Sequence, residues 1–232
     1  RNTIRGRQIT MIMQHPIAAL NPVMRIQEQI AEVLVHTMSK REARRAAIER
    51  LGEVNIPEPE KVARYYPHQL SGGMAQRVMI ALMLSSEPPL LIADEPTTAL
   101  DVTVQAQVLL LLEELVKKKN SSVLLITHDM SVVAETCDRV GVMYAGDMAE
   151  AGSVGEIIFD PKHPYTKGLM QAIPSVERSE LEGIPGTVPD LVNPPPGCRF
   201  HPRCPHAMER CTKEKPLPRE VSEGHMVACH LY

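Results

Sequence analysis

The sequence has no stretch long and apolar enough to cross a bilayer, and it carries no strong excess of charge. No apolar run approaches the roughly 18 to 20 residues of a membrane-spanning helix, so we expect any membrane role to be peripheral. No secretory signal peptide opens the chain. The formal net charge of −3 gives no electrostatic case for nucleic-acid binding. An apolar content of 44% excludes wholesale disorder.

Between Leu70 and Asp101 the sequence holds two features that suit phosphate binding. The first is Leu70-Ser71-Gly72-Gly73, a turn of small residues that opens into a helix with one apolar face. A helix start has unpaired amides and partial positive charge, Ser71 can cap it, and the glycines let a ligand approach the backbone. We therefore expect an anion there. Taken alone this signal is weak, because Ser-Gly-Gly occurs in many loops.

The second feature is an acidic pair at the end of a predicted strand. Leu90 to Ala93 is a continuous apolar run, typical of a central strand in a parallel sheet, and Asp94 and Glu95 follow it. Open α/β sheets bind ligands at the carboxyl ends of their strands, so the pair is placed where catalysis occurs. Taken alone, such a pair is more often part of a solvated loop.

Two further polar residues end predicted strands. Gln14 closes a short apolar segment near the start of the chain, and His128 follows the predicted buried strand 123–127. An amphipathic helix predicted over 102–119 makes this region a right-handed parallel crossover, which brings His128 beside Glu95. Taken alone, Gln14 would be a surface amide and His128 a structural hydrogen-bond donor.

The periodicity predicts the remaining core elements. They are helices over 23–37, 39–54 and 130–137, and a hairpin of 139–144 with 148–152. The helix over 39–54 has a Ser39/Glu42 capping box and a solvated face at Arg41, Arg44 and Arg45.

Together and in this order, these motifs resemble the nucleotide-binding domain of ATP-binding-cassette (ABC) proteins. The resemblance implies that Leu70 to Arg77 is the signature motif and that Leu90 to Glu95 is the Walker B strand. It also implies that Ala99 to Asp101 is the D-loop, that His128 is the switch histidine and that Gln14 is the Q-loop glutamine. The resemblance implies an α/β fold: a P-loop NTPase-like cassette with a parallel sheet core and a helical subdomain at about 23–85.

The resemblance also implies roles for these residues toward ATP and Mg²⁺. Glu95 would deprotonate the attacking water, Asp94 would hold Mg²⁺ through water, and Gln14 and His128 would complete the contacts to metal and γ-phosphate. In a dimer of two ABC ATPase subunits, identical or not, the signature residues Ser71, Gly72, Gly73 and Gln76 would serve the ATP bound mainly by the partner, and Asp101 would cross the interface.

ABC domains carry a phosphate loop of the form GxxxxGK(S/T) upstream of the glutamine, and these residues contain none. The chain begins with Arg1, and its first strand arrives within a dozen residues. We therefore expect a fragment that lacks its Walker A portion and is inactive alone. The expected domains are a nucleotide-binding domain over 1–152 and a C-terminal extension over 153–232.

The extension contains a cysteine-rich tail. Ten of the twenty prolines fall between Pro174 and Pro218, so we expect a largely irregular segment. Such a segment needs a covalent cross-link or a bound metal to be compact. The cysteines Cys198, Cys204, Cys211 and Cys229 suit that purpose, whereas Cys137 reads as an ordinary buried thiol. Disulfides conflict with a cytosolic ATPase. Chemistry alone leaves zinc, with or without His201, His206, His225 or His230, level with a four-iron, four-sulfur cluster.

A second resemblance decides between them. The segment His163 to Thr166 and the module from Gly197 to Pro205 are similar to the tail of ATPase subunits of dipeptide, oligopeptide and nickel importers, some of which hold a [4Fe-4S] cluster. All four candidate ligands are cysteine here. The resemblance therefore implies a cluster with a structural role, with zinc as the alternative.

The expected function is that of a prokaryotic importer's ATPase subunit for di- or oligopeptides, or nickel, on the cytoplasmic face of the membrane. Its partners would be a second ATPase subunit, transmembrane permease subunits and, indirectly, a solute-binding protein, without nucleic acid. Two alternatives stay open: a soluble ABC ATPase of another process, and a non-hydrolysing module that bears a metal cluster. The sequence does not identify the solute.

Overall fold

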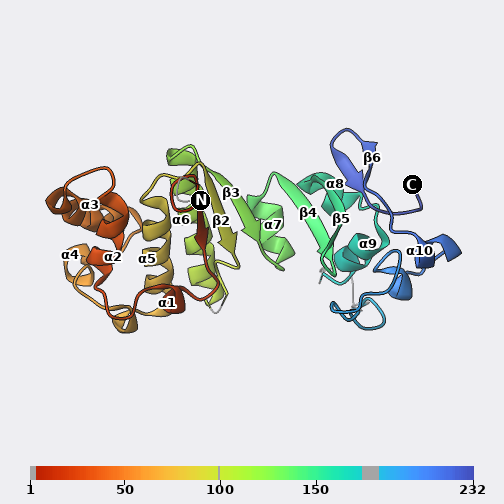
Figure 1. Cartoon of the computed structure of the whole chain (residues 1–232), viewed down its shortest axis with the longest axis horizontal. Helices are drawn as coiled ribbons and strands as arrows, with labels where there is room; N and C mark the ends of the chain where they lie inside the picture. The colour runs from red at the N-terminus through yellow and green to blue at the C-terminus, as the bar shows by residue number, and fades with distance from the viewer. Residues whose placement is uncertain (1–3, 99, 174–182) are drawn as a thin grey trace. The chain divides into compact units, whose positions relative to one another are not determined.

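The computed structural model describes residues 4–98, 100–173 and 183–232, and the chain forms two compact units, 1–128 and 129–232 (Figure 1). The expected domain boundary at 152 falls later than this division. The reason is that the strand ending at Ser153 pairs with the C-terminal hairpin and so belongs with the tail. Among the described residues, no helix is long and apolar enough to cross a membrane.

The first unit is built on a parallel sheet in the order β1-β2-β3. Its strands are β1 (Ile9–Ile12), β2 (Leu90–Asp94) and β3 (Ser122–Ile126). Helix α6 (Val102–Lys118) connects β2 to β3, which pair in parallel, so the predicted crossover is confirmed. All three strands end at one edge of the sheet, and the site lies at that edge.

The sequence predicted that strand β3 is buried, but the structure leaves much of it exposed. Leu124 is 52% exposed and Ile126 45% exposed. The cause is position: among the described residues β3 pairs only with β2 and forms an edge of this sheet. The central strand β2 behaves as expected on one face, where Leu91 and Ala93 are fully buried.

A helical subdomain packs against the sheet through the long helix α5 (Gly72–Leu84). Figure 1 shows α5 between the sheet and the outer helices, and α5 contacts β1, α2 and α3. The smaller elements are α1 (Pro16–Ala19), α2 (Ile26–Leu34), α3 (Lys40–Glu53), α4 (Pro59–Val62) and the 3₁₀ turn η1 (Pro67–Gln69). One continuous apolar core joins these helices to the sheet.

Local capping fixes where the helices of this subdomain begin. The predicted capping box of α3 is confirmed, because Ser39 Oγ accepts from the Glu42 amide and Glu42 accepts from the Ser39 amide. Helix α2 begins later than predicted, since the buried amide of Gln29 bonds the Asn21 backbone and the Met24 carbonyl and holds the preceding residues in a turn.

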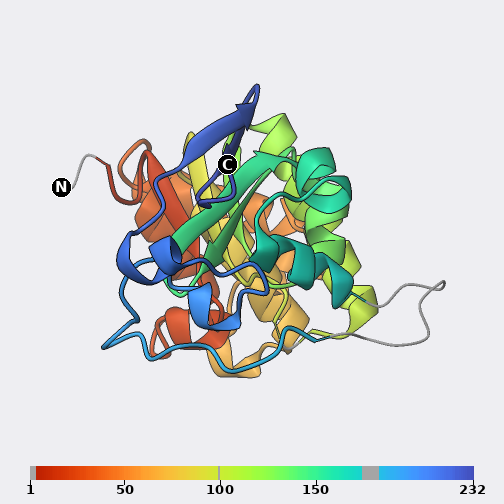
Figure 2. The same cartoon turned by 90° about the vertical axis from the view of Figure 1, so that its right-hand side faces the viewer.

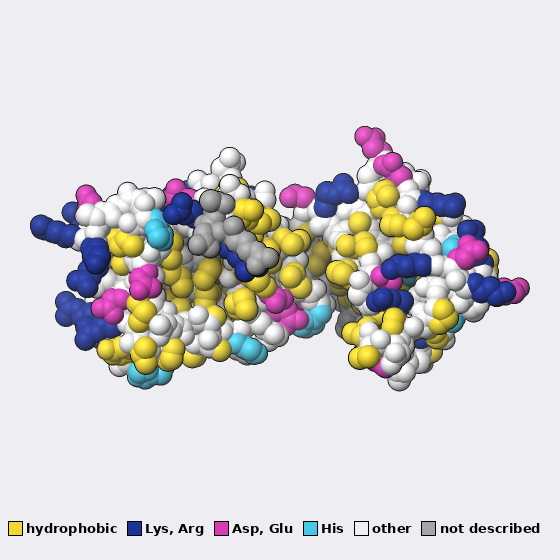
Figure 3. Space-filling model, in the orientation of Figure 1, with side chains coloured by type: hydrophobic (Ala, Val, Ile, Leu, Met, Phe, Trp, Pro, Cys, Tyr) yellow, Lys and Arg dark blue, Asp and Glu magenta, His cyan; other side chains and the backbone are white. Residues whose placement is uncertain are grey.

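The outer face of α3 is basic, as the sequence predicted. Arg41, Arg44 and Arg45 are exposed. Figure 3 shows dark-blue Lys and Arg side chains gathered over the part of the first unit where Figure 1 labels α3. Arg45 approaches Glu49 at 3.4 Å, one helical turn away.

The second unit contains an antiparallel sheet in the order β4-β5-β7-β6. Its strands are β4 (Arg139–Tyr144), β5 (Asp147–Ser153), β6 (Arg219–Ser222) and β7 (His225–Val227). Figure 2 shows the C-terminal hairpin in dark blue beside the green strands. The helices are α7 (Met130–Thr136), α8 (Val154–Phe159), α9 (Pro164–Gln171) and α10 (Glu209–Lys213), with the 3₁₀ turn η2 (His201–Arg203).

The tail has more core than its composition suggested. Phe200, 3% exposed, packs edge-on against Tyr144 of β4, and both rings meet Tyr165 of α9. Val227 of β7 is fully buried. The expectation of a largely irregular tail is therefore only partly right, because the hairpin and this aromatic cluster provide packing.

Candidate functional site

The backbone at the end of β2 presents Glu95 at the edge of the parallel sheet. Glu95 has a φ of +43°, in the left-handed region that side chains other than glycine rarely adopt. Its amide donates to the Ile126 carbonyl at 2.9 Å, which holds this residue against the end of β3. Residues kept in such conformations cluster at active sites, because the surrounding structure must offset the strain.

Three donors converge on the Glu95 carboxylate. Gln14 Nε2 donates to Oε2 at 2.8 Å and Thr98 Oγ1 donates to the same oxygen at 2.7 Å. His128 Nδ1 lies 3.0 Å from Oε1. Gln14 follows β1 and His128 follows β3, so the carboxyl ends of adjacent parallel strands bring them to the central residue. The structure thus places together the three residues for which the sequence predicted catalytic roles.

These contacts stabilise the ionised form of Glu95. The hydroxyl of Thr98 and, next, His128 lower the pKa of this carboxyl below its ordinary value. Burial opposes them, and Gln14 adds a smaller lowering effect. An ionised carboxylate can accept a proton from a bound water at neutral pH. His128 is 82% exposed, so its ring is accessible to a ligand.

Asp94 and Gln14 offer oxygen atoms suited to a magnesium ion. Within the described residues, the half-buried carboxylate of Asp94 has no hydrogen bond or ion pair. Gln14 donates to Glu95 through nitrogen, which leaves its amide oxygen as an acceptor. Mg²⁺ is commonly held by one or two carboxylates plus substrate phosphates. These two oxygen ligands suit Mg²⁺. In the described part of the chain, however, no group of three or more His, Cys, Asp or Glu side chains is arranged to hold a metal ion.

Ser71 begins α5 as the sequence predicted, with its Oγ accepting from the Met74 amide. Gly72 is exposed at this helix start, whereas a Cβ on Gly73 would lie 3.0 Å from the Val104 side chain of α6. Gln76 lies on the buried side: it is 2% exposed, and its Nε2 has no partner among the described residues. The exposed start of α5 therefore consists of Ser71 and Gly72, without Gln76.

Asp101 caps the next helix. Its Oδ1 accepts from the Val104 amide at 3.0 Å, which fixes the start of α6. The side chain is exposed. Of the D-loop segment 99–101, Ala99 lies outside the described residues.

Comparisons with known proteins identify the family. A model of the ABC transporter family matches residues 1–98, and one described as "Oligopeptide/dipeptide transporter, C-terminal region" matches 149–211. The chain is 52% identical to the oligopeptide transport ATP-binding protein AppD of Bacillus subtilis, over 99% of this chain and 71% of the relative. The chain belongs to the ATP-binding proteins of oligopeptide and dipeptide ABC transporters.

Two further matches agree with this family. The oligopeptide transport ATP-binding protein OppD of Salmonella typhimurium is 51% identical, over 98% of this chain and 69% of the relative. A dimeric post-hydrolysis structure of the ATP-binding cassette MJ0796, bound to ADP and Pi, is 30% identical with a TM-score of 0.58, and the match covers 66% of each chain. The predicted cassette fold, a parallel sheet with a helical subdomain, is confirmed.

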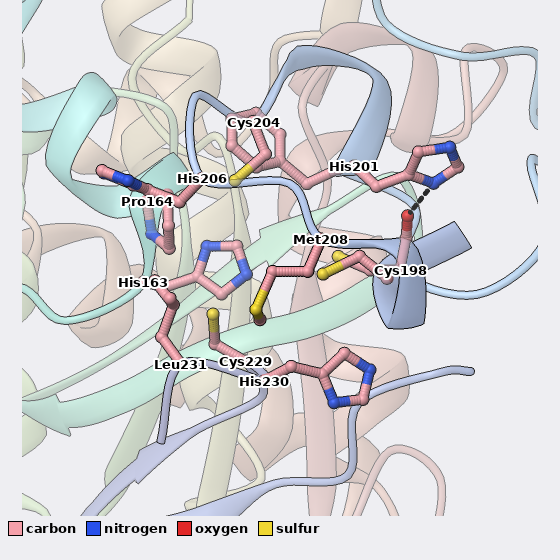
Figure 4. A pocket seen from close by; sticks show the side chains of 12 residues that line it. His163, Pro164, Cys198, His201, Cys204, His206, Met208, Cys229, His230 and Leu231 are labelled. Carbon is pink, nitrogen blue, oxygen red and sulfur yellow. Dashed lines mark hydrogen bonds between the residues drawn. The ribbon is translucent and has the colours of Figure 1, made fainter. Parts of the chain in front are cut away.

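In this ABC protein the four tail cysteines line one small cavity. Cys198, Cys204, Cys211 and Cys229 border it together with histidines and Met208 (Figure 4). The Cys198 amide donates to the Cys211 carbonyl, which ties two of the cysteine segments together. Burial raises the pKa of the Cys198, Cys204 and Cys229 thiols, so they stay protonated at neutral pH until a cation displaces the protons.

The histidines that the sequence offered as alternative ligands are mostly engaged elsewhere. His201 Nδ1 lies 2.9 Å from the Cys198 carbonyl, and His230 Nε2 lies 2.9 Å from the Glu214 carbonyl. His225 pairs with the buried Glu150. These contacts hold the three histidine rings on other partners, and no group of three or more His, Cys, Asp or Glu side chains in the described residues is arranged to bind a metal ion.

The sequence analysis did not identify Thr98, the residue that lowers the pKa of Glu95 most. The available signal was its place three residues after Glu95, with Pro96 between them, a spacing typical of a β-turn. In this ABC cassette the turn brings the hydroxyl back onto the carboxylate.

Proposed function

We propose that this chain is the ATP-hydrolysing part of a subunit that drives uptake of dipeptides or oligopeptides at the cytoplasmic face of a prokaryotic membrane. One observation carries the proposal: Gln14 and His128 converge on an ionised Glu95 in a chain 52% identical to a peptide-transport ATP-binding protein. Nickel is the alternative solute.

The residues divide the chemistry of hydrolysis between them. Asp94 and the amide oxygen of Gln14 would hold Mg²⁺, which would neutralise charge on the phosphates. Glu95 accepts the proton of the attacking water, and His128 contacts the γ-phosphate. Positioning and charge stabilisation supply most of the acceleration, because phosphoryl transfer needs little covalent work from the protein.

The start of α5 serves a second ATP-binding subunit. Ser71, Gly72 and Gly73 present helix amides and partial positive charge, which favour the phosphates of ATP held by that partner. Gln76 joins them only if the helix start rearranges, since its side chain is buried. Asp101 lies exposed at the start of α6, in a position to reach across such an interface.

Reconstitution with the permease partners tests the function. The assembly in lipid vesicles should take up a labelled dipeptide or oligopeptide only when ATP is supplied on the cassette side. Labelled nickel serves as the competing solute. Uptake of nickel alone would replace the peptide assignment, and ATP hydrolysis without uptake of either would contradict an import function.

The cysteine cavity supports a second proposal, a structural [4Fe-4S] cluster held by Cys198, Cys204, Cys211 and Cys229. Four thiolates are the usual ligands of such a cluster, and all four residues border one cavity. Iron and sulfide analysis of anaerobically purified protein should find about four of each per chain. Cys204→Ser should lower both values, whereas Cys137→Ser, outside the cavity, should not. Stoichiometric zinc, or no metal, would overturn the cluster.

A further inference from the structure

Thr98 is held over Glu95 by a short turn. The Thr98 amide donates to the Glu95 carbonyl at 3.2 Å, and Pro96 occupies the second position of this turn, where its fixed φ is favourable. This geometry directs the hydroxyl to the carboxylate, with Oγ1 to Oε2 at 2.7 Å. The backbone bond and the proline close the turn by themselves, so the hydroxyl is not required for its shape.

The two oxygens of Glu95 differ in their surroundings. Oε2 accepts from both Gln14 and Thr98, whereas among the described residues Oε1 has only His128 as a partner. Each carboxylate oxygen has about two acceptor positions. Oε2 is therefore saturated, and Oε1 keeps one position open beside the exposed histidine.

We propose that Thr98 is a positioning residue for hydrolysis: by filling Oε2 it makes Oε1 the oxygen that takes the proton of the attacking water. The inference rests on the proposed ATPase function. In this step an O–H bond of water breaks and its proton passes to Oε1. The water oxygen bonds to the γ-phosphorus, and the bond from that phosphorus to the bridging oxygen breaks as ADP leaves.

Without the hydroxyl, the carboxylate can rotate about its last bond and present either oxygen. The proton acceptor is then aligned for only part of the time, which lowers kcat without weakening ATP binding.

The test compares Thr98→Val with Thr98→Ser in the assembled ATPase. Thr98→Val removes the donor and should lower kcat about tenfold, the range expected for a hydrogen bond to a charged group, with KM for ATP unchanged within about twofold. Thr98→Ser keeps the donor and should retain kcat. Thr97→Val is the matched control, since no side-chain hydrogen bond of Thr97 occurs in the described structure.

Wild-type kcat in Thr98→Val, or an equal fall in both Thr98 variants, would overturn the positioning role. The two failures are distinguishable: a wild-type assembly that hydrolyses no ATP contradicts the proposed function, whereas an active wild type with equal kcat in Thr98→Val contradicts only the positioning role.

Discussion

Glu150 Oε1 and His225 Nε2 lie 2.7 Å apart with both side chains buried, and this pair joins β5 to the C-terminal hairpin across 75 residues of sequence. The same carboxylate accepts from the amides of Lys162 and His163. A buried carboxylate with this many donors organises the second unit, because each donor would otherwise be left unpaired.

Glu150→Ala should therefore destabilise the second unit strongly. Removing a buried carboxylate costs about 1 to 3 kcal/mol, since the groups that donated to it stay buried without partners. Denaturant unfolding followed by a probe in this unit measures the loss. Glu223→Gln, an exposed carboxylate on the same hairpin, is the control and should change the free energy of unfolding by less than about 0.5 kcal/mol. Equal stability of both variants would contradict the organising role.

The capping box of α8 makes stability depend on acid pH. The Ser153 amide and hydroxyl lower the pKa of Glu156 to about 2, from 4.5. Because the folded-state pKa lies below the unfolded one, the stabilisation is present above about pH 4.5 and is lost as the pH falls toward 2. Glu156→Gln should thus unfold at lower urea concentration than wild type at pH 6. The difference should shrink by pH 3; a constant difference across this range would rule out the ionised cap as its cause.

The cysteine segments depend on Gly197. Its φ is +72°, and a Cβ at this position would overlap the Cys211 carbonyl oxygen and lie 2.9 Å from the Thr212 carbonyl carbon. Gly197→Ala should therefore cost more than about 2 kcal/mol of unfolding free energy. It should also lower the metal content of the purified protein. The matched control is Gly155→Ala in α8, where a Cβ meets open space and the helix favours alanine. Tolerance of both changes would contradict this packing.

The group of polar residues at the edge of the parallel sheet could be predicted from the sequence because it depends only on strand order. Gln14, Glu95 and His128 each follow an apolar strand, and parallel pairing places such positions side by side whatever the details of packing. Local capping was equally predictable, since Ser39 and Ser71 each accept from an amide three residues away.

What the sequence could not supply depended on distant partners. The exposure of Leu124 follows from which strands flank β3, and the start of α2 follows from a buried Gln29 side chain. The C-terminal hairpin could not be foreseen because its partner strand lies some 75 residues earlier. The burial of Gln76 has the same origin: helical position alone does not say which face meets the core.

The most direct test of the account is ATP turnover by the assembled transporter carrying Glu95→Gln. The amide keeps the size of the side chain but cannot accept the water's proton, so turnover should fall at least about a hundredfold while ATP binding persists. Glu114→Gln, an exposed change on α6, should turn over ATP like wild type. Wild-type-like hydrolysis in Glu95→Gln would contradict the assignment of Glu95 as the base.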